Sequence, residues 1–282
     1  MTSSADFTSA GQRRPLFNLK RIRRLAIAVA VLAPALYFLP IVTLFYLCCG
    51  AFDIARQKNI TAELVEKYFM GNGILTWLLS PLNLIADLLS PKNHLVYRLE
   101  DLPAEHRAEI ETCVREFVSN GERIKAHVAQ KFGQSKRCML TYKWYDVPQT
   151  TDLAIPAFER DYRFIKTIAV SVFSTRERTS WHFGPLRLTL RVLYNLDPIP
   201  GHDVFIEANG VTNYWSENPL FIFDDTVFHR SVNDVDQLRY CLFMDIVRPN
   251  YLPRPFDFAV HVSSVIAAAF KRAFYKNWSF IR

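Results

Sequence analysis

The chain changes character near Met139, where helical spacing gives way to short apolar or alternating runs. These runs read MLTYKWY, IKTIAVSVF, LRLTLRVLYNL, DVFIEA, PLFIFD and RYCLFMDIV. Turn-forming pairs separate several of them, namely Asp197-Pro198, Asn209-Gly210 and Asn218-Pro219. Many short strands punctuated by such turns are typical of sandwiches and barrels. The sequence therefore predicts a mainly β fold of jelly-roll type.

A helical stretch precedes the strands. Residues 104–131 place Ile110, Val114, Phe117 and other apolar residues at helical spacing, with charges on the other side. We expect helices flanking the strands and one domain over residues 96–250.

The most apolar segment lies near the N-terminus. Residues 25–52 carry no charge over 28 residues, and about 20 apolar residues suffice to span a bilayer. Six basic residues come before this run: Arg13, Arg14, Lys20, Arg21, Arg23 and Arg24. We interpret the run as a transmembrane anchor, kinked at Pro34 and Pro40, that follows a basic tail over residues 1–24. It is too long for the core of a signal peptide.

Two further apolar segments leave the number of membrane passes open. Residues 73–90 contain Pro81 and Asp87, and they fit an interfacial or re-entrant helix pair or a helix packed on the domain. Residues 251–282 mix aromatic and basic residues, which suits a membrane-surface helix or a helix that covers a sheet face. We expect a membrane-proximal helical region over residues 53–95 and an amphipathic C-terminal helix over 251–282.

The formal net charge of +7 raises nucleic acid as a partner, but six of the basic residues stand directly before the uncharged run. Such placement is typical of a membrane flank. The sequence has no zinc-finger spacing and no aromatic strand of the RNA-binding type, so nucleic-acid binding is not expected. Five cysteines without a C-x-x-C pair do not require an oxidising compartment.

Two of the seven histidines, His182 and His229, stand at the ends of predicted strands, 47 residues apart. In a jelly roll such a pair can meet inside the barrel, although this spacing alone is a weak signal. Arg191 and Arg239 lie in otherwise apolar strands, where a guanidinium is costly unless it meets an anion. They fit a dicarboxylate co-substrate or structural ion pairs. The candidate partners for such ion pairs are Asp224, Asp225, Asp245 and Glu207.

These positions belong to a longer pattern between residues 166 and 249. It consists of H-F-G-P at His182–Pro185, Arg191, F-D-D-T-V-F-H at Phe223–His229, Arg239 and D-I-V-R-P at Asp245–Pro249. In this order and spacing the segment resembles the aspartyl/asparaginyl β-hydroxylase family of Fe(II)- and 2-oxoglutarate-dependent dioxygenases, which includes lipid hydroxylases. The resemblance implies a double-stranded β-helix, the jelly roll of cupin-like proteins.

The resemblance also implies roles for particular residues. His182 and His229 would ligate Fe(II), and Arg239, helped by Ser171, would bind the distal carboxylate of 2-oxoglutarate. Arg191 would meet a carboxylate of the co-substrate or the substrate. The implied reaction uses O2 and converts 2-oxoglutarate to succinate and carbon dioxide while a C–H bond is hydroxylated.

Two positions depart from common patterns. A site of two histidines and one carboxylate often takes the carboxylate two residues after the first histidine, where this chain has Gly184. Protein hydroxylases of the family share this glycine and hold iron by two histidines, so neighbouring groups matter more, and Asp224 or Asp225 is a candidate partner for His229. Leu193 stands where family members commonly have a histidine, which removes a polar contact to the co-substrate.

The substrate stays open at this level. The apolar segments favour a membrane enzyme that hydroxylates a lipid acyl chain of the lipid A or ornithine-lipid type. Gly184 and a single anchor are also compatible with hydroxylation of Asp or Asn side chains in proteins, and Leu193 is compatible with a non-catalytic member. We expect the catalytic domain on the cytoplasmic face, where iron and 2-oxoglutarate are available, although the basic flank and one straight span would predict the other side.

Overall fold

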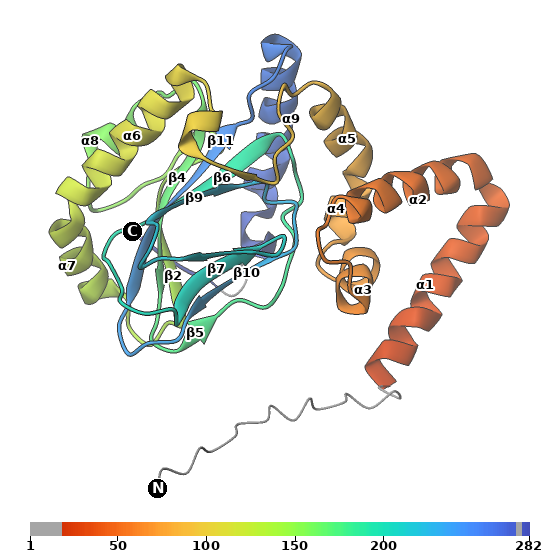
Figure 1. The fold of residues 1–282 in the computed structure, drawn as a ribbon, viewed down its shortest axis with the longest axis horizontal. Helices are drawn as coiled ribbons and strands as arrows, with labels where there is room; N and C mark the ends of the chain where they lie inside the picture. Colours follow the sequence, from red (N-terminus) through yellow and green to blue (C-terminus); the bar gives the residue numbers. More distant parts are fainter. Residues whose placement is uncertain (1–18, 275–277) are drawn as a thin grey trace, which may run out of the picture. The chain divides into compact units, whose positions relative to one another are not determined.

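The computed structural model describes residues 19–274 and 278–282, and Figure 1 labels the elements. The helices are α1 (Leu19–Phe38), α2 (Pro40–Ala55), α3 (Ala62–Met70), α4 (Ile74–Leu78), α5 (Ser80–Leu88), α6 (Ala104–Ser119), α7 (Gly121–Lys131), α8 (Pro156–Glu159) and α9 (Pro253–Phe274). The strands are β1 (Val96–Tyr97), β2 (Arg137–Trp144), β3 (Val147–Pro148), β4 (Ile165–Phe173), β5 (Glu177–Arg178), β6 (Thr189–Asn195), β7 (Val204–Ala208), β8 (Val211–Tyr214), β9 (Leu220–Phe223), β10 (His229–Asn233), β11 (Arg239–Val247) and β12 (Ser279–Ile281). The chain divides into two compact units, residues 1–47 and 48–282.

Strands β4 to β11 form the barrel of the second unit. They pair in a nested antiparallel series, β4 with β11, β5 with β10, β6 with β9 and β7 with β8. The larger sheet contains the order β9-β6-β11-β4, and the smaller sheet has the order β5-β10-β7-β8. This nested series divided between two sheets is a jelly roll. The predicted mainly β fold with flanking helices is therefore confirmed.

The larger sheet separates two apolar cores, because successive side chains of a strand point to opposite faces. On β11, Tyr240, Leu242 and Met244 belong to the outer core, whereas Cys241 and Phe243 belong to the core inside the barrel. Every residue of β11 is buried, so both faces of this strand are covered.

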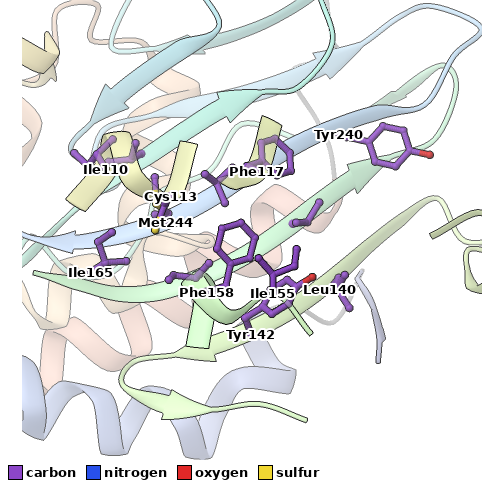
Figure 2. Close-up of a cluster of buried hydrophobic side chains, with 14 of the residues drawn as sticks. Ile110, Cys113, Phe117, Leu140, Tyr142, Ile155, Phe158, Ile165, Tyr240 and Met244 are labelled. Carbon is purple, nitrogen blue, oxygen red and sulfur yellow. The ribbon is translucent and has the colours of Figure 1, made fainter. Parts of the chain in front are cut away.

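Helices α6, α7 and α8 cover the outer face of the larger sheet (Figure 1). Figure 2 shows the resulting core, in which Ile110, Cys113 and Phe117 of α6 and Phe158 of α8 lie over the strands. Burial of a side chain such as Phe117 stabilises the fold by about 2 to 3 kcal/mol. The helical face read from the sequence thus holds the larger sheet in place.

The uncharged run near the N-terminus is not one helix. Helix α1 ends at Phe38 and α2 begins at Pro40, because proline lacks the N–H of an interior helical residue and is tolerated in a first turn. Within the described ranges, no helix is both long enough and apolar enough to cross a membrane. The predicted transmembrane anchor over residues 25–52 is therefore not supported. Residues 1–18 of the predicted basic tail lie outside the described residues.

The C-terminal segment combines a helix with a strand. We expected a helix over residues 251–282, and α9 covers Pro253–Phe274 of it, while residues 275–277 lie outside the described residues. Ser279–Ile281 form β12, which pairs in parallel with β2. This added strand covers an edge of the larger sheet that would otherwise present unpaired backbone groups.

A buried network of charges joins the helices before the barrel to the barrel itself. Its members are Asp53, Arg56, Asp87, Arg187, Asp224 and Arg248. Arg187 lies 2.8 Å from Asp53, 2.9 Å from Asp87 and 3.1 Å from Asp224. Burial opposes ionisation of Asp224, but Arg187 and Arg248 hold the pKa of its carboxyl at about 2. Three positive and three negative groups make the network neutral. Asp53 and Asp87 of the predicted membrane-proximal region 53–95 contact Arg187 in this network, and the region is part of the same compact unit as the barrel.

Asp224→Asn should strongly destabilise this unit. The substitution leaves Arg187 and Arg248 buried without their shared carboxylate, and breaking a buried pair in this way costs about 3 to 5 kcal/mol. Denaturant unfolding of the full chain measures the change. Asp236→Asn is the matched control, because Asp236 pairs with Arg176 on the surface and its loss should leave stability nearly unchanged. Equal stability of both variants would contradict the assigned role of the network.

Candidate functional site

His182 and His229 lie side by side at one end of the barrel. The N–H of each donates to the C=O of the other at 3.0 Å, in an isolated antiparallel bridge. Their ring centroids are 4.1 Å apart. We call this end of the barrel the histidine end. The two histidines that the sequence singled out are thus brought together by the start of β10.

Both imidazole rings are held in the same tautomer. Nδ1 of His182 lies 2.8 Å from Ser180 O, and Nδ1 of His229 lies 2.8 Å from Val227 O. A carbonyl oxygen only accepts, so each Nδ1 carries the hydrogen and each Nε2 of the neutral ring keeps its lone pair. Burial lowers the pKa of His182 to about 3 and that of His229 to about 4. Both rings are therefore neutral near pH 7 and suited to ligate a metal.

Asp225 fills the space that a side chain at position 184 would need. The N–H of Gly184 donates to Asp225 O at 2.7 Å, and a Cβ on Gly184 would overlap the Asp225 carboxylate. One oxygen of this carboxylate lies 3.5 Å from Nε2 of His229. The carboxylate that is missing two residues after His182 is thus supplied near the same place by the turn before β10.

His229 and Asp225 turn two acceptor atoms toward each other. The Nε2 atom of neutral His229 presents a lone pair, and Oδ1 of Asp225 lies 3.5 Å from it and 3.1 Å from Nη1 of Arg191. Arg191 offsets the charge of the carboxylate, and the lowered pKa of His229 disfavours a proton between the two acceptors. Imidazole nitrogens with a carboxylate oxygen suit iron. Within residues 19–274 and 278–282, no group of three or more His, Cys, Asp and Glu side chains is already arranged around a metal position. The residues fit a two-histidine site with a carboxylate beside it.

Arg191 is paired with two aspartates. Its Nε donates to Asp245 at 2.7 Å, and its Nη2 donates to Asp225 at 3.1 Å. The guanidinium also lies 4.0 Å from the centre of the Phe243 ring. The sequence left open whether Arg191 binds a dicarboxylate co-substrate or forms structural ion pairs, and the structure contains the ion pairs. Arg191 therefore fixes the position of Asp225 at the histidine end.

Arg239 lies inside the barrel without a carboxylate. Its guanidinium is 2% exposed, donates from Nη1 to Ser231 Oγ at 2.9 Å, and stacks 4.2 Å from the centre of the Phe173 ring. Its Nε has no hydrogen-bond partner. Burial lowers the pKa of Arg239, and the described residues place no acidic side chain in ion-pair contact with it. A buried cation in this condition is costly to the folded state.

Ser171 and Leu193 flank the space between the arginines. Ser171 lies opposite Cys241, beside Arg239 in register, and its hydroxyl donates to Cys241 O at 3.2 Å. Leu193 lies opposite Phe243 and is part of the core inside the barrel. Position 193, where family members commonly have a histidine, thus contributes an apolar side chain to the inside of the barrel.

Sequence reasoning missed Ser231 and Asn83. Ser231 follows His229 by two residues on β10, so the alternation of a strand could have placed both side chains on one face. Asn83 donates to Pro185 O at 3.2 Å and accepts from the N–H of Arg187 at 2.9 Å. Its only signal in the sequence is its place among polar residues at helical spacing within an apolar segment.

The fold and the histidine pair define a jelly-roll protein with a candidate metal site. The sequence pattern of the aspartyl/asparaginyl beta-hydroxylase family matches residues 139–249, which run from within β2 to just past β11 and include the two histidines. The resemblance inferred from the motifs is confirmed over this segment.

One curated relative is the ornithine lipid ester-linked acyl 2-hydroxylase of Rhizobium tropici. It is 31% identical over 93 residues, which are 33% of this chain and 33% of the relative. The chain thus matches about a third of the length of that protein.

Solved structures with a likeness to this chain include the following two bacterial proteins. One is an oxidoreductase of the 2OG-Fe(II) oxygenase family from Burkholderia pseudomallei, at 14% identity and a TM-score of 0.31 over 47% of this chain and 81% of that one. The other is a cupin domain from Bordetella pertussis, at 15% identity and a TM-score of 0.25 over 40% of this chain and 98% of that one. The assignment of the jelly roll rests on the strand order instead.

Gly184→Ala should disturb the site through Asp225. The added methyl group overlaps the carboxylate, which must leave Arg191, and overpacking of this kind costs about 1 to 3 kcal/mol. Thermal unfolding measures the loss. The double variant Gly184→Ala/Asp225→Gly removes the overlapping carboxylate and should recover part of the stability. A single variant as stable as the unaltered chain would show that Asp225 does not fill this space.

Proposed function

We propose that this chain is an Fe(II)- and 2-oxoglutarate-dependent hydroxylase that acts on an acyl chain of a membrane lipid. The observation that carries the proposal is Arg239, a buried guanidinium without an acidic partner among the described residues. An unpaired buried charge costs several kcal/mol, so its retention favours an anionic ligand inside the barrel. Such a ligand would lie near His182 and His229.

The spacing inside the barrel supports 2-oxoglutarate as this ligand. Arg239 donates to Ser231, which follows His229 by two residues on the same face of β10. Two residues of a strand span about 7 Å, the scale of a short dicarboxylate. One carboxylate of 2-oxoglutarate pairs with Arg239, and the other end reaches the histidines. The apolar side chains of Leu193 and Phe243 suit the methylene groups between them.

The chain's own residues have separable tasks in this proposal. His182 and His229 hold the iron, and Arg191 holds Asp225 beside it. When bound, Fe(II) with 2-oxoglutarate and O2 supplies the oxidising chemistry. The overall reaction converts R–H, O2 and 2-oxoglutarate to R–OH, succinate and carbon dioxide. The buried ring of Phe223 lies 5.0 Å from that of His229 and limits the access of water to this histidine.

The lipid substrate is supported by the relative from Rhizobium tropici, whose name assigns it an ester-linked acyl chain. An acyl chain offers only unactivated C–H bonds, and their hydroxylation is the kind of reaction that iron with 2-oxoglutarate serves. The deciding experiment follows succinate release by detergent-solubilised protein with Fe(II), 2-oxoglutarate and O2. A membrane lipid extract should stimulate release and gain one oxygen in the mass spectrum. Stimulation only by a pool of Asp- and Asn-containing peptides would replace the lipid by a protein substrate.

Arg239→Leu should raise the KM for 2-oxoglutarate by about a hundredfold, because a charge-assisted pair to its carboxylate is lost. Initial rates of succinate release at varied 2-oxoglutarate measure this change. Arg176→Leu, at an exposed ion pair, is the control and should leave the KM unaltered. An unchanged KM in Arg239→Leu would return Arg239 to a structural role.

His229→Ala should abolish metal binding as well as turnover. Removal of one of two neutral ligands leaves a single imidazole, which holds a divalent ion weakly. Calorimetric titration with Co(II), an oxygen-stable substitute for Fe(II), measures affinity independently of activity. His202→Ala is the matched control, because His202 lies on the surface against Glu217. Equal Co(II) affinity of the two variants would exclude His229 as a ligand.

A further inference from the structure

Helices α4 and α5 form one nearly continuous helix beside the histidine end. The N–H of Leu79 donates to Leu75 O, and the N–H of Asn83 donates to Leu79 O, so the hydrogen-bond series runs across their junction. Residues 74–88 therefore have an inner and an outer face that can be read as for one helix.

The inner face of this helix carries a polar stripe. Four residues at helical spacing make up this stripe: Thr76, Ser80, Asn83 and Asp87. Ala86 beside it is buried in an apolar cluster. Thr76 donates to Gly184 O at 2.9 Å, and Asp87 accepts from Arg187 at 2.9 Å. The one charge of the segment is thus turned into the protein and neutralised there.

The outer face is purely aliphatic. Every exposed residue between positions 74 and 88 is Ile or Leu: Ile74, Leu75, Leu78, Ile85 and Leu88. Leu88 is 80% exposed and Leu78 is 54% exposed. A helix on a water-exposed surface normally has the opposite arrangement, with its apolar stripe against the core. We call these five residues the apolar face.

Neighbouring elements extend the apolar face. The N–H of Tyr251 donates to Leu89 O, which brings the loop before α9 next to the end of α5. Tyr251, Leu252 and Phe258 are 64%, 48% and 69% exposed. Lys92 and Arg254, which are close in the sequence to Leu88 and Leu252, are exposed, as is the acidic Asp257.

We propose that the apolar face is the surface by which the barrel unit lies on a lipid bilayer, with the histidine end presented to acyl chains. The bonded contacts of Thr76 and Asp87 put the helix directly against the segment that follows His182. A helix of this length spans about 20 Å, which suits a position in the plane of the interface. For its substrate the inference rests on the proposed function, whereas its geometry is independent of it.

A bilayer fits this face better than a second copy of the chain. Interfaces between proteins contain frequent hydrogen bonds, whereas the exposed side chains of residues 74–88 are all aliphatic and offer none. The exposed aromatic residues Tyr251 and Phe258 stand near the basic Arg254 in the sequence, a combination typical of a membrane surface.

Residues 48–282 carry 28 basic and 26 acidic residues, a net charge of +2, and the exposed Lys92 and Arg254 among them favour an anionic lipid surface. The uncharged residues 25–52 precede the face in the sequence, and Phe52 in the same compact unit is 64% exposed.

The test reads the face locally, so that other segments of the full chain do not decide it. In a Cys48→Ser background, which removes the exposed cysteine, Leu78→Cys and Leu88→Cys are labelled with an environment-sensitive fluorophore. Val118→Cys is the matched control, since Val118 is an exposed aliphatic residue of α6. The protein is reconstituted with phosphatidylethanolamine and phosphatidylglycerol vesicles that contain acyl-chain quenchers.

We expect strong quenching at positions 78 and 88, at a depth of about 5 to 10 Å, and little at position 118. Equal quenching at the three positions would overturn the proposal. Absence of quenching at positions 78 and 88 would also overturn the proposal. If the unlabelled variants then formed dimers cross-linked through these cysteines, a second copy would cover the face.

A second pair of measurements separates this inference from the proposed function. Leu78→Asp/Leu88→Asp should lower hydroxylation of vesicle lipid by about tenfold while 2-oxoglutarate turnover without substrate is retained. Quenching without any lipid hydroxylation would leave the bilayer contact standing and refute the lipid substrate. Lipid hydroxylation without quenching, or undiminished by the two aspartates, would refute the bilayer contact and leave the proposed function standing.

Discussion

The interaction on which the rest of this unit depends is the ion pair between Asp224 and Arg187. Both groups are buried, and neither could remain charged there alone. Arg187 stands just after the H-F-G-P segment, and Asp224 stands in the turn before β10, so their contact holds together the two stretches that carry His182 and His229. The same guanidinium reaches Asp53 and Asp87, which ties the preceding helices to the histidine end.

This tie has a consequence for the surface. Because Asp87 and its polar neighbours must face Arg187 and the backbone near Gly184, the aliphatic side of α4 and α5 can only face outward. One requirement thus explains both the buried charges and the exposed leucines. Loss of the charge network would release the helix that carries the apolar face and would also loosen the wall of the histidine end.

The strands, the histidine pair and the two arginines could be predicted from the sequence, because alternation and motif spacing are local signals. The packing of residues 104–131 on the strands could also be predicted, but the contacts of α4 and α5 with the barrel could not. Asp87 looked like an interruption of an apolar segment, and nothing nearby announces its partner Arg187, which lies 100 residues further along the chain. The sequence predicted a kink at Pro40 within one helix, whereas Pro40 begins a new helix. Long-range pairing, unlike periodicity, leaves no trace in neighbouring residues.

Arg191 and Arg239 look alike in the sequence, but they have different partners in the structure. Arg191 is neutralised by Asp225 and Asp245, so it orients a carboxylate that the chain already owns. Arg239 has no such partner among the described residues, and the proposed function assigns its charge to the co-substrate. This difference follows from position 184. Gly184 leaves room for the Asp225 carboxylate, and this carboxylate pairs with Arg191. Arg239 is therefore the arginine of the two that has no carboxylate among the described residues. In the proposed two-histidine site the carboxylate comes from the turn before β10 and the anion-binding arginine from β11.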